Sequence, residues 1–306
     1  MNSMSSPKVI APLLTAVVPV TRMANQLNLL DQWIKGCTGK SIEIILLHDI
    51  RDEETSFELE NIVSNNFKSN IVLFEGKYGS PGSARNLGIQ MAKGEWVAFW
   101  DCDDKPHVDT ILQILQSESG TSNFEVIIGQ FNVYDVIAGN MIGKNKRDSS
   151  LSDVALNPGV WRMLFRKDTI GDVRFPHIKM AEDQNFLSAI RLPEKKLKIM
   201  NEIFYTYYLG NLGQLTAQKS AVDEIINAAR FTLLRIKDSK GATLDFNATL
   251  FSRQIITGIM KGSLKIKFKC ISLFMKSIVF NKGLNAIVII GKVLSILLQR
   301  NRRKLA

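Results

Sequence analysis

Cysteine is scarce in this sequence of 306 residues. Cys37, Cys102 and Cys270 are odd in number and far apart, so they provide neither a disulfide framework nor the closely spaced pairs of a zinc site. Few unpaired cysteines are typical of proteins that work in a reducing compartment. The sequence therefore predicts a cytoplasmic protein without structural disulfides.

The sequence also lacks the patterns of a targeting peptide and of a membrane-spanning helix. Residues 1–8 do not show the basic, apolar and small-residue segments of a signal peptide. The apolar run 9–20 contains two prolines and is too short to span a bilayer, and run 284–298 is short and interrupted by Lys292. We therefore expect neither a leader nor a membrane span.

Acidic residues are absent from the end of the chain. Asp245 is the last of them, and residues 246–306 contain 12 Lys plus Arg. The preceding 245 residues contain 27 basic and 29 acidic side chains, so this tail supplies the net charge of +10. The sequence predicts a near-neutral first domain, residues 1–217, followed by a helical basic region, residues 218–306.

Strand and helix patterns alternate along the first half of the chain. Short apolar runs typical of buried strands are each followed by helical spacing of apolar residues. The expected strands are 13–20, 42–47, 71–74, 96–100 and 125–134. The expected helices are 24–35, 53–66 (with Phe57, Ile62 and Val63 inward), 82–93 and 108–117. Such units predict an α/β fold with a central, mainly parallel sheet and helices on both faces.

Three carboxylates, Asp101, Asp103 and Asp104, follow the fourth expected strand directly. Open α/β sheets bind ligands at the carboxyl ends of their strands. Like charges this close repel unless a cation or a proton offsets them, and a hard divalent ion shared with phosphates would do so. The alternative is that Asp103 or Asp104 only caps a helix that opens near Pro106. The neighbouring loops favour the metal site.

Other segments near this edge of the sheet contain residues suited to a ligand. Asp49 follows the second strand and can bind a sugar or a nucleobase, although Asp is also common in turns. The glycine-rich segment 76–88 leads into a helix, where backbone N–H groups and Arg85 favour an anion, although such a segment is often only a loop. Glu182 and Asp183 begin a later helix. They either stabilise the start of that helix as a capping pair or supply a carboxylate that acts as a general base.

Together these segments resemble the family 2 glycosyltransferases. The resemblance rests on 82–88 (Gly-Ser-Ala-Arg-Asn-Leu-Gly), on 92–104, which contains Lys-Gly-Glu and ends in Asp-Cys-Asp-Asp, and on 17–20, 43–49 and 181–183. The segments occur in the family's order over residues 13–215. The resemblance implies a GT-A nucleotide-binding fold, inverting transfer from a nucleotide-sugar donor, expected to be a UDP-sugar, and Mg²⁺ or Mn²⁺ as cofactor.

The resemblance also implies roles for single residues. The positions expected to contact the donor are Pro19, Asp49, Arg85 and Asp101. Asp103 would bind the metal with Asp104 sharing it, and Asp183 would be the catalytic base that deprotonates the acceptor hydroxyl.

The sequence departs from the family pattern in a few places. Residues 21–22 are Thr-Arg where the family often has Tyr-Asn, and His48 replaces the first acid of a usual pair. Both departures affect which nucleotide we expect the protein to bind more than which reaction we expect it to catalyse. The Gln-x-x-Arg-Trp signature of processive synthases is absent, which predicts single addition. Tyr205, Tyr207 and Tyr208 would stack on the acceptor sugar or pack in the core.

The basic tail shows helical spacing in which lysines and apolar residues separate. One side would carry Lys261, Lys265, Lys269 and Lys276. The other would carry Met260, Leu264, Phe268, Ile271, Met275 and Ile278. Lys267 interrupts the apolar side, and Gly283 would end the segment. The tail either packs on the catalytic domain with a solvated basic face or binds an anionic membrane surface. Binding of nucleic acid would account for the positive charge of the tail but not for the acidic residues upstream, so it ranks third among these interpretations.

The sequence thus predicts a metal-dependent glycosyltransferase, peripheral at the cytoplasmic face of the inner membrane. Its acceptor would be a glycan or a lipid-linked glycan in bacterial cell-surface polysaccharide assembly. The alternative is a non-catalytic protein of the same fold that binds nucleotide sugar or membrane, against which the intact Asp101, Asp103 and Asp183 argue. A nucleotidyltransferase would need a glycine-rich loop directly after the first strand. Residues 21–25, Thr-Arg-Met-Ala-Asn, contain no glycine, so this class does not fit.

Overall fold

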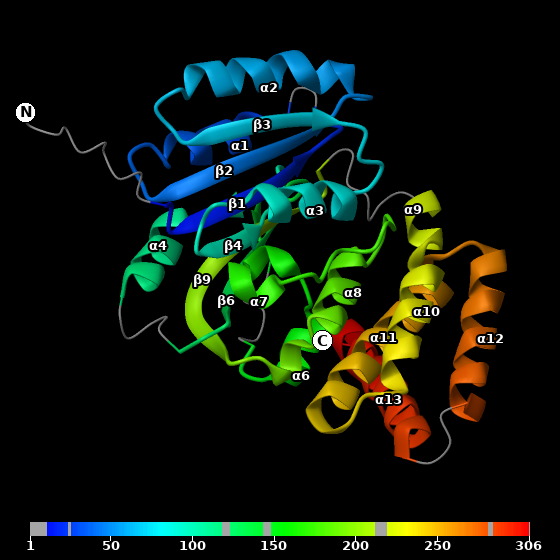
Figure 1. Cartoon of the computed structure of the whole chain (residues 1–306). Coiled ribbons are helices and arrows are strands. Elements are labelled where there is room, and N and C mark those ends of the chain that lie inside the picture. The colour runs from blue at the N-terminus through cyan, green and yellow to red at the C-terminus, as the bar shows by residue number, and fades with distance from the viewer. Residues whose placement is uncertain are drawn as a thin grey trace, which may run out of the picture.

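The structure is a computed structural model that describes residues 11–23, 26–117, 123–142, 148–211, 219–280 and 284–305. An α/β part comes first, and a group of helices, α9 to α13, follows it (Figure 1). The α/β class and the helical C-terminal region predicted from the sequence are both confirmed.

The described residues contain one sheet of nine strands, in the order β3-β2-β1-β4-β8-β6-β9-β5, with β7 paired to β6. The strands are β1 (Leu14–Val20), β2 (Ile42–Asp49), β3 (Ile71–Gly76), β4 (Trp96–Phe99), β5 (Lys105–Pro106), β6 (Val126–Asp135), β7 (Asn140–Met141), β8 (Met163–Arg166) and β9 (Leu197–Leu209). Strands β3, β2, β1 and β4 run parallel, as the βα units predict. The sequence did not indicate that β8 would lie antiparallel between β4 and β6.

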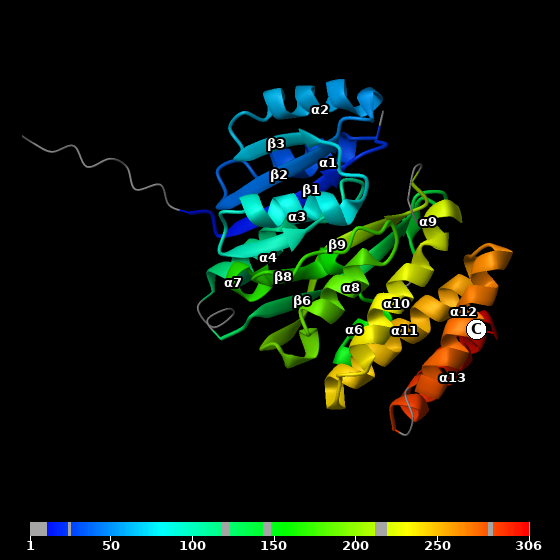
Figure 2. The same ribbon diagram turned by 45° about the vertical axis from the view of Figure 1, so that its right-hand side comes forward.

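Helices cover both faces of this sheet (Figures 1 and 2). In the α/β part they are α1 (Asn28–Lys35), α2 (Glu53–Asn65), α3 (Pro81–Met91), α4 (Val108–Gln116), α6 (Leu151–Leu156), α7 (Lys167–Ile170) and α8 (Glu182–Ala189), with 3₁₀ turns η1 (Val160–Arg162) and η2 (Leu192–Glu194). Successive side chains of a strand point to opposite faces. Ala16 and Val18 of β1 therefore pack with α1, α2 and α4, whereas Val17 packs with α3 and α8.

One expectation for helix α2 is wrong. Phe57, expected to face the core, is 74% exposed. The buried residues of this helix are Thr55, Leu59 and Ile62. Their spacing defines one side of the helix, and Phe57 lies about 160° away from Leu59 at ~100° per residue. Val63 is partly buried, at the edge of the packed side.

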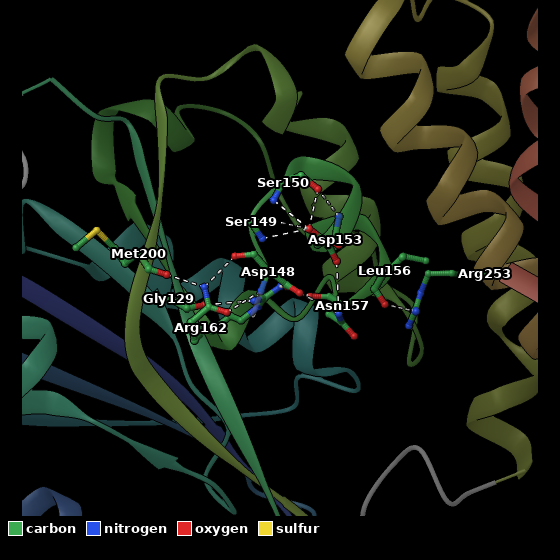
Figure 3. A network of polar contacts seen from close by, with 11 residues as sticks. Gly129, Asp148, Ser149, Ser150, Asp153, Leu156, Asn157, Arg162, Met200 and Arg253 are labelled. Carbon is green, nitrogen blue, oxygen red and sulfur yellow. Dashed lines mark hydrogen bonds and ion pairs between the residues drawn. The ribbon is translucent and has the colours of Figure 1, made fainter. Parts of the chain in front are cut away.

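A buried ion pair and the hydrogen bonds around it hold the segment between β7 and β8 (Figure 3). Arg162 is fully buried, and its Nη2 lies 2.5 Å from Oδ2 of Asp148 and 2.6 Å from the carbonyl oxygen of Asn157. Gln130 of β6 donates to the Met200 carbonyl of β9 over 2.6 Å. Arg253 of α11 donates to the Leu156 carbonyl at the end of α6. The segment that precedes β8 is therefore held by paired polar groups rather than by apolar packing alone.

The C-terminal helices pack partly into the core of the α/β part. They are α9 (Lys219–Asp223), α10 (Ile225–Ile236), α11 (Gly241–Lys261), α12 (Leu264–Phe280) and α13 (Leu284–Leu305). Phe246 and Leu250 of α11 are buried in the same cluster as Phe99 of β4 and Phe186 of α8. In the part of the chain that the structure describes, no helix has both the length and the apolar character needed to cross a membrane.

The single amphipathic helix expected around residues 260–278 is wrong. Helix α11 ends at Lys261, Gly262 is its C-terminal cap, and α12 begins at Leu264. A Cβ atom at Gly262 would lie 2.5 Å from the Gly258 carbonyl oxygen, so this break depends on glycine. Lys261 therefore does not share a helix face with the later lysines. Gly283 lies outside the described residues.

Candidate functional site

A pocket of about 400 Å³ opens at the carboxyl ends of β1 and β2. Pro19 and Asp49, both predicted to contact a donor, line it, and so do residues 21–22, where the sequence departs from the family pattern. Tyr78 and Lys179 also line this pocket. This is the edge at which an open α/β sheet is expected to bind its ligand, so the position predicted for the donor site coincides with an actual cavity.

Asp49 is held in the pocket by two neighbours. The Gly79 N–H donates to its Oδ2 over 3.1 Å, and Nε of Arg51 donates to its Oδ1 over 2.7 Å. The hydrogen bond from Arg51 keeps the pKa of Asp49 well below its usual range, although partial burial acts in the opposite direction. Asp49 is thus an ionised hydrogen-bond acceptor that faces the pocket.

Helix α3 begins at the same pocket. Ser80 is its N-cap and accepts a hydrogen bond from the Ser83 N–H over 3.2 Å, and Pro81 occupies the first turn. Gly79, just before the cap, has φ +75°, and a Cβ there would lie 3.3 Å from the His177 ring. Because L side chains rarely adopt this conformation, the chain needs glycine at this position to bring the helix start to the pocket.

Arg85, on α3, joins two segments that are distant in the sequence. Its Nη2 lies 2.7 Å from Oδ1 of Asp101, after β4, and its Nη1 lies 2.7 Å from Oε1 of Glu182, at the start of α8. The guanidinium is buried and lies 5.5 Å from the centre of the Phe175 ring. Burial opposes its charge, but Asp101 and Glu182 outweigh burial and raise the pKa of Arg85. Arg85 therefore fixes the end of β4 relative to α8.

Asp183 lies next to this ion pair, in the first turn of α8. It is half-buried, and its Oδ1 accepts a hydrogen bond from the Gln184 N–H over 2.7 Å. Burial, together with the negative charge of Glu182, raises the pKa of Asp183 to about 7. The residue before the pair, Ala181, has φ 60°, an uncommon conformation for alanine that sets the direction in which the helix begins. Asp183 can therefore exchange a proton near neutral pH.

The carboxylates of the acidic cluster lie in different surroundings. Asp101 is bound to Arg85, and its backbone N–H donates to the Tyr205 hydroxyl over 3.0 Å. Asp103 is half-buried. Asp104 is fully buried, and its Oδ1 accepts a hydrogen bond from the Tyr208 N–H over 2.7 Å. Burial and the two neighbouring carboxylates raise the pKa of Asp104 well above its usual range.

The capping alternative for this cluster is wrong. Helix α4 begins at Val108, its N-cap is His107, and no side-chain hydrogen bond caps it. Asp104 binds β9 instead, and the Asp103 carbonyl accepts a hydrogen bond from Asn211 over 3.0 Å. The cluster therefore belongs to the contact between the end of β4 and the end of β9.

The donor atoms of the cluster fit a hard divalent ion that is shared with a substrate. Carboxylate oxygens are the ligands such ions prefer. Asp101 and Asp103 are both half-buried, whereas Asp104 is buried, and Arg85 already binds Asp101. Among the described residues, no group of three or more His, Cys, Asp or Glu side chains is arranged to hold a metal ion. A metal ion here would complete its coordination with donor phosphate oxygens and water, as Mg²⁺ commonly does.

Sequence reasoning missed two features of the site. The ion pair between Arg85 and Glu182 joins residues 97 positions apart, and no local pattern announces it. Trp161 stacks on Tyr205 with ring centres 4.7 Å apart and on Tyr207 at 5.9 Å. Tyr205 is thus a buried packing residue whose hydroxyl also orients the Asp101 backbone. His48 is fully buried and does not line the pocket; its Nδ1 lies 3.4 Å from the Val20 carbonyl oxygen.

Comparisons with known sequences identify the family of this chain. The family model described as Glycosyl transferase family 2 matches residues 23–183, more than half of the chain. The chain is 27% identical over 210 residues to a cholesterol galactosyltransferase of Borreliella burgdorferi, covering 60% of this chain and 57% of that protein. It is 25% identical over 213 residues to a poly(ribitol-phosphate) beta-glucosyltransferase of Bacillus spizizenii, covering 66% of this chain and 33% of that protein. The chain thus spans only part of the length of these relatives.

Solved structures show the same fold at low sequence identity. The structure of S. aureus TarS 1-349 in complex with UDP-GlcNAc has a TM-score of 0.62 at 17% identity, and the match covers 87% of this chain and 80% of that one. The mannosyltransferase PcManGT from Pyrobaculum calidifontis, in complex with GDP-Man and Mn²⁺, has a TM-score of 0.53 at 13% identity, with 94% and 88% covered. The fold resembles that of these two proteins, and the family model, which matches more than half of the chain, decides the relationship: this chain belongs to glycosyl transferase family 2.

Proposed function

We propose that this glycosyltransferase moves a sugar, with inversion, from a nucleotide-diphosphate sugar to a hydroxyl of a glycan or a lipid-linked glycan in bacterial cell-surface polysaccharide assembly. One observation carries the proposal. Arg85 brings the acidic segment after β4 and the Glu182–Asp183 pair together, at 2.7 Å on each side, at the edge of the sheet that also holds the pocket. A leaving-group site and a base are therefore adjacent.

The pocket suits the nucleotide part of the donor. Asp49 offers an ionised acceptor for the N–H or O–H groups of a base or ribose, and Tyr78 offers a ring beside it. UDP-GlcNAc and GDP-Man are bound by the two structures of similar fold, which supports a nucleotide-sugar donor of this class. We expect a UDP-sugar.

The diphosphate would lie between the start of α3 and the acidic segment. Free N–H groups at a helix N-terminus favour an anion, and the Lys179 side chain lines the same pocket. Asp103 would bind Mg²⁺ or Mn²⁺ together with the phosphates, and Asp104 would hold the segment in place through Tyr208. When bound, the metal ion would offset the charge that develops on the departing diphosphate.

Asp183 would act as the base in a single displacement. The acceptor oxygen attacks the anomeric carbon on the side opposite the diphosphate, its proton passes to the Asp183 carboxylate, and the bond from the anomeric carbon to the phosphate oxygen breaks. The nucleoside diphosphate leaves with that electron pair. A base with a pKa of about 7 suits this task because about half of it is ionised at neutral pH and its carboxylate binds a proton well.

A screen of nucleotide sugars, with and without Mn²⁺ or Mg²⁺, tests the proposal. We expect metal-dependent hydrolysis or transfer with at least one UDP-sugar, and its loss in Asp103→Asn. Asp172→Asn, which alters an exposed aspartate away from the pocket, is the matched control and should leave turnover unchanged. Turnover that is unaffected by chelation and by Asp103→Asn would contradict the metal assignment. If no nucleotide sugar is bound in calorimetry, the non-catalytic alternative becomes the better account.

A further inference from the structure

Helix α12 presents a stripe of large apolar side chains to solvent. Leu264 is 70% exposed, Phe268 64% and Val279 62%, and Ile271 and Met275 are also exposed. These residues follow one another at intervals of three or four, which places them within about 80° of one another on the helix at ~100° per residue. We call these five residues the α12 stripe. It is a continuous apolar strip along the whole helix.

The core does not need this stripe. Ile266, Cys270 and Ser277 of α12 are buried, and the first two pack with residues of α10 and α11. All three lie about 140–180° from the middle of the stripe at ~100° per residue, so the helix packs with one side and exposes the apolar residues of the other. The outward side of a helix in a water-soluble protein is normally polar. The stripe therefore calls for an occupant outside the described part of the fold.

Lysines border the stripe on both sides. Lys265, Lys269 and Lys276 are exposed and lie about 40–80° beyond one border, and Lys267 lies close to the other border. No ion pair involving them occurs within the residues that the structure describes. Residues 246–306 contain no acidic side chain, so all the charged side chains of α12 itself are basic. Asp223 lies at the start of this helix, where its Oδ1 accepts a hydrogen bond from the Ser263 N–H over 2.8 Å.

Helix α13, next to α12, also exposes large apolar side chains on one side. Ile287 is 67% exposed and Leu298 63%, and Leu294 between them is also exposed, whereas Ile289 and Ile296 on its other side are buried. The two helices are packed together and form the edge of the molecule that is farthest from the strands β1, β2 and β3 (Figure 2). A second apolar strip therefore lies on the same outer part of the protein.

We propose that α12, with α13 beside it, lies in the surface of an anionic lipid bilayer, with the α12 stripe in the outer acyl region and the flanking lysines among the headgroups. An apolar strip bordered by lysines is the pattern of a helix that lies in a membrane interface. Anionic headgroups also neutralise the local charge. A second copy of this chain is a poorer occupant because a symmetric contact through α12 would bring the same lysines together. The proposal does not depend on the transfer reaction.

Vesicle co-flotation of the full chain tests the proposal. We expect binding to vesicles of phosphatidylcholine with one-third phosphatidylglycerol, weak binding to phosphatidylcholine alone, and a decrease with salt. Phe268→Ser should weaken binding about tenfold because it removes buried apolar area. The matched control is Phe67→Ser, since Phe67 is 77% exposed but lies between α2 and β3, and it should bind as the unaltered protein does.

Two triple variants test how much the lysines contribute to vesicle binding. Replacing Lys265, Lys269 and Lys276 with Gln should weaken binding to the anionic vesicles about a hundredfold, at about fivefold per lysine. Replacing Lys68, Lys105 and Lys196, which are exposed elsewhere, should change it little. Unchanged UDP affinity in calorimetry would show that each variant is folded, independently of any transfer activity.

Two results would overturn the proposal. One is equal loss of vesicle binding in Phe268→Ser and Phe67→Ser, or binding that is as tight to neutral vesicles as to anionic ones. The other is a concentration-dependent dimer in analytical ultracentrifugation that Phe268→Ser dissociates, because the stripe would then be covered by a second copy of the chain.

Discussion

At the residue scale, the site depends on how few cations balance its carboxylates. Asp101, Glu182 and Asp183 lie around the single guanidinium of Arg85, which binds two of them at 2.7 Å. A planar, forked guanidinium can bind both carboxylates at once, whereas an ammonium is a single point charge. The identity of this residue, and not only its charge, is therefore expected to matter.

Arg85→Lys tests this point. We expect a loss of stability of about 3–5 kcal/mol, because one buried carboxylate loses its partner, and a large fall in turnover, because α8 is no longer held against the end of β4. Urea unfolding and steady-state turnover are the measurements. Lys93→Arg, at an exposed lysine that pairs with Glu43, is the control and should change neither by much. Turnover and stability close to those of the unaltered protein would show that Arg85 does not organise the site.

The pH dependence of turnover reports on Asp183. Its pKa is raised to about 7, firstly by burial and secondly by Glu182. Because a base accepts a proton only when it is ionised, kcat/KM should rise as the pH increases through about 7 and level off above it. Glu182→Gln removes a neighbouring negative charge, so the pKa of Asp183 should fall and the rise should move to lower pH. A rise centred near pH 4 in the unaltered protein, or a shift to higher pH in Glu182→Gln, would contradict this assignment.

At the scale of the elements, close contact between α3 and β1 positions Arg85. A Cβ atom at Gly88 would lie 2.2 Å from Cγ1 of Val17, so the helix can lie this close to the strand only with glycine there. Gly291, in α13, has nothing within 4 Å of such a Cβ atom. The two glycines are therefore helical positions with opposite surroundings.

Gly88→Ala is expected to destabilise the protein by about 1–3 kcal/mol through overpacking and to lower turnover by displacing α3. Gly291→Ala should be neutral or stabilise by up to about 1 kcal/mol, since alanine favours a helix more than glycine does. The midpoint of urea unfolding measures both. Equal effects of the two substitutions would mean that α3 does not rest on β1 as described.

The elements also show what the sequence could predict. Runs of apolar residues located β1 to β4, and the cluster at Asp101 to Asp104 was placed correctly at the end of a strand, because these features depend on local patterns. The Arg85–Glu182 pair depends on a tertiary contact over 97 positions, and no local pattern encodes it. The break at Gly262 and the outward direction of the α12 stripe escaped prediction for a related reason: helical spacing identifies two faces but does not say which one packs.

At the scale of the whole molecule, the C-terminal helices serve two different surfaces. Phe246 and Leu250 of α11 are buried against the α/β part, whereas Phe268 of α12 faces solvent. The domain boundary predicted at residues 217 and 218 stays a prediction, but the core continues across it. The two interpretations of the C-terminal region, packing on the α/β part and binding a membrane, are therefore compatible. Helices α10 and α11 pack inward, and α12 remains available for a membrane.

Truncation separates the two surfaces. A chain that ends at residue 217 would expose the side of the core that Phe246 and Leu250 cover, and we expect it to be insoluble or to unfold at a much lower temperature. A chain that ends at residue 262 retains α10 and α11, and we expect it to fold, to bind UDP and to lose vesicle binding. Equal thermal stability of the chain that ends at 217 and the full chain would show that the C-terminal helices are independent of the core.

The central claim is that Asp183 is the base and the segment Asp101–Asp104 holds the donor. The most direct test compares Asp183→Asn with the unaltered protein in two assays, UDP binding by calorimetry in the presence of Mn²⁺ and steady-state transfer with an active UDP-sugar. We predict an affinity for UDP within about twofold of the original and a turnover lowered by about 10²–10⁴. Turnover retained in Asp183→Asn, or lost only in proportion to UDP binding, would contradict the account.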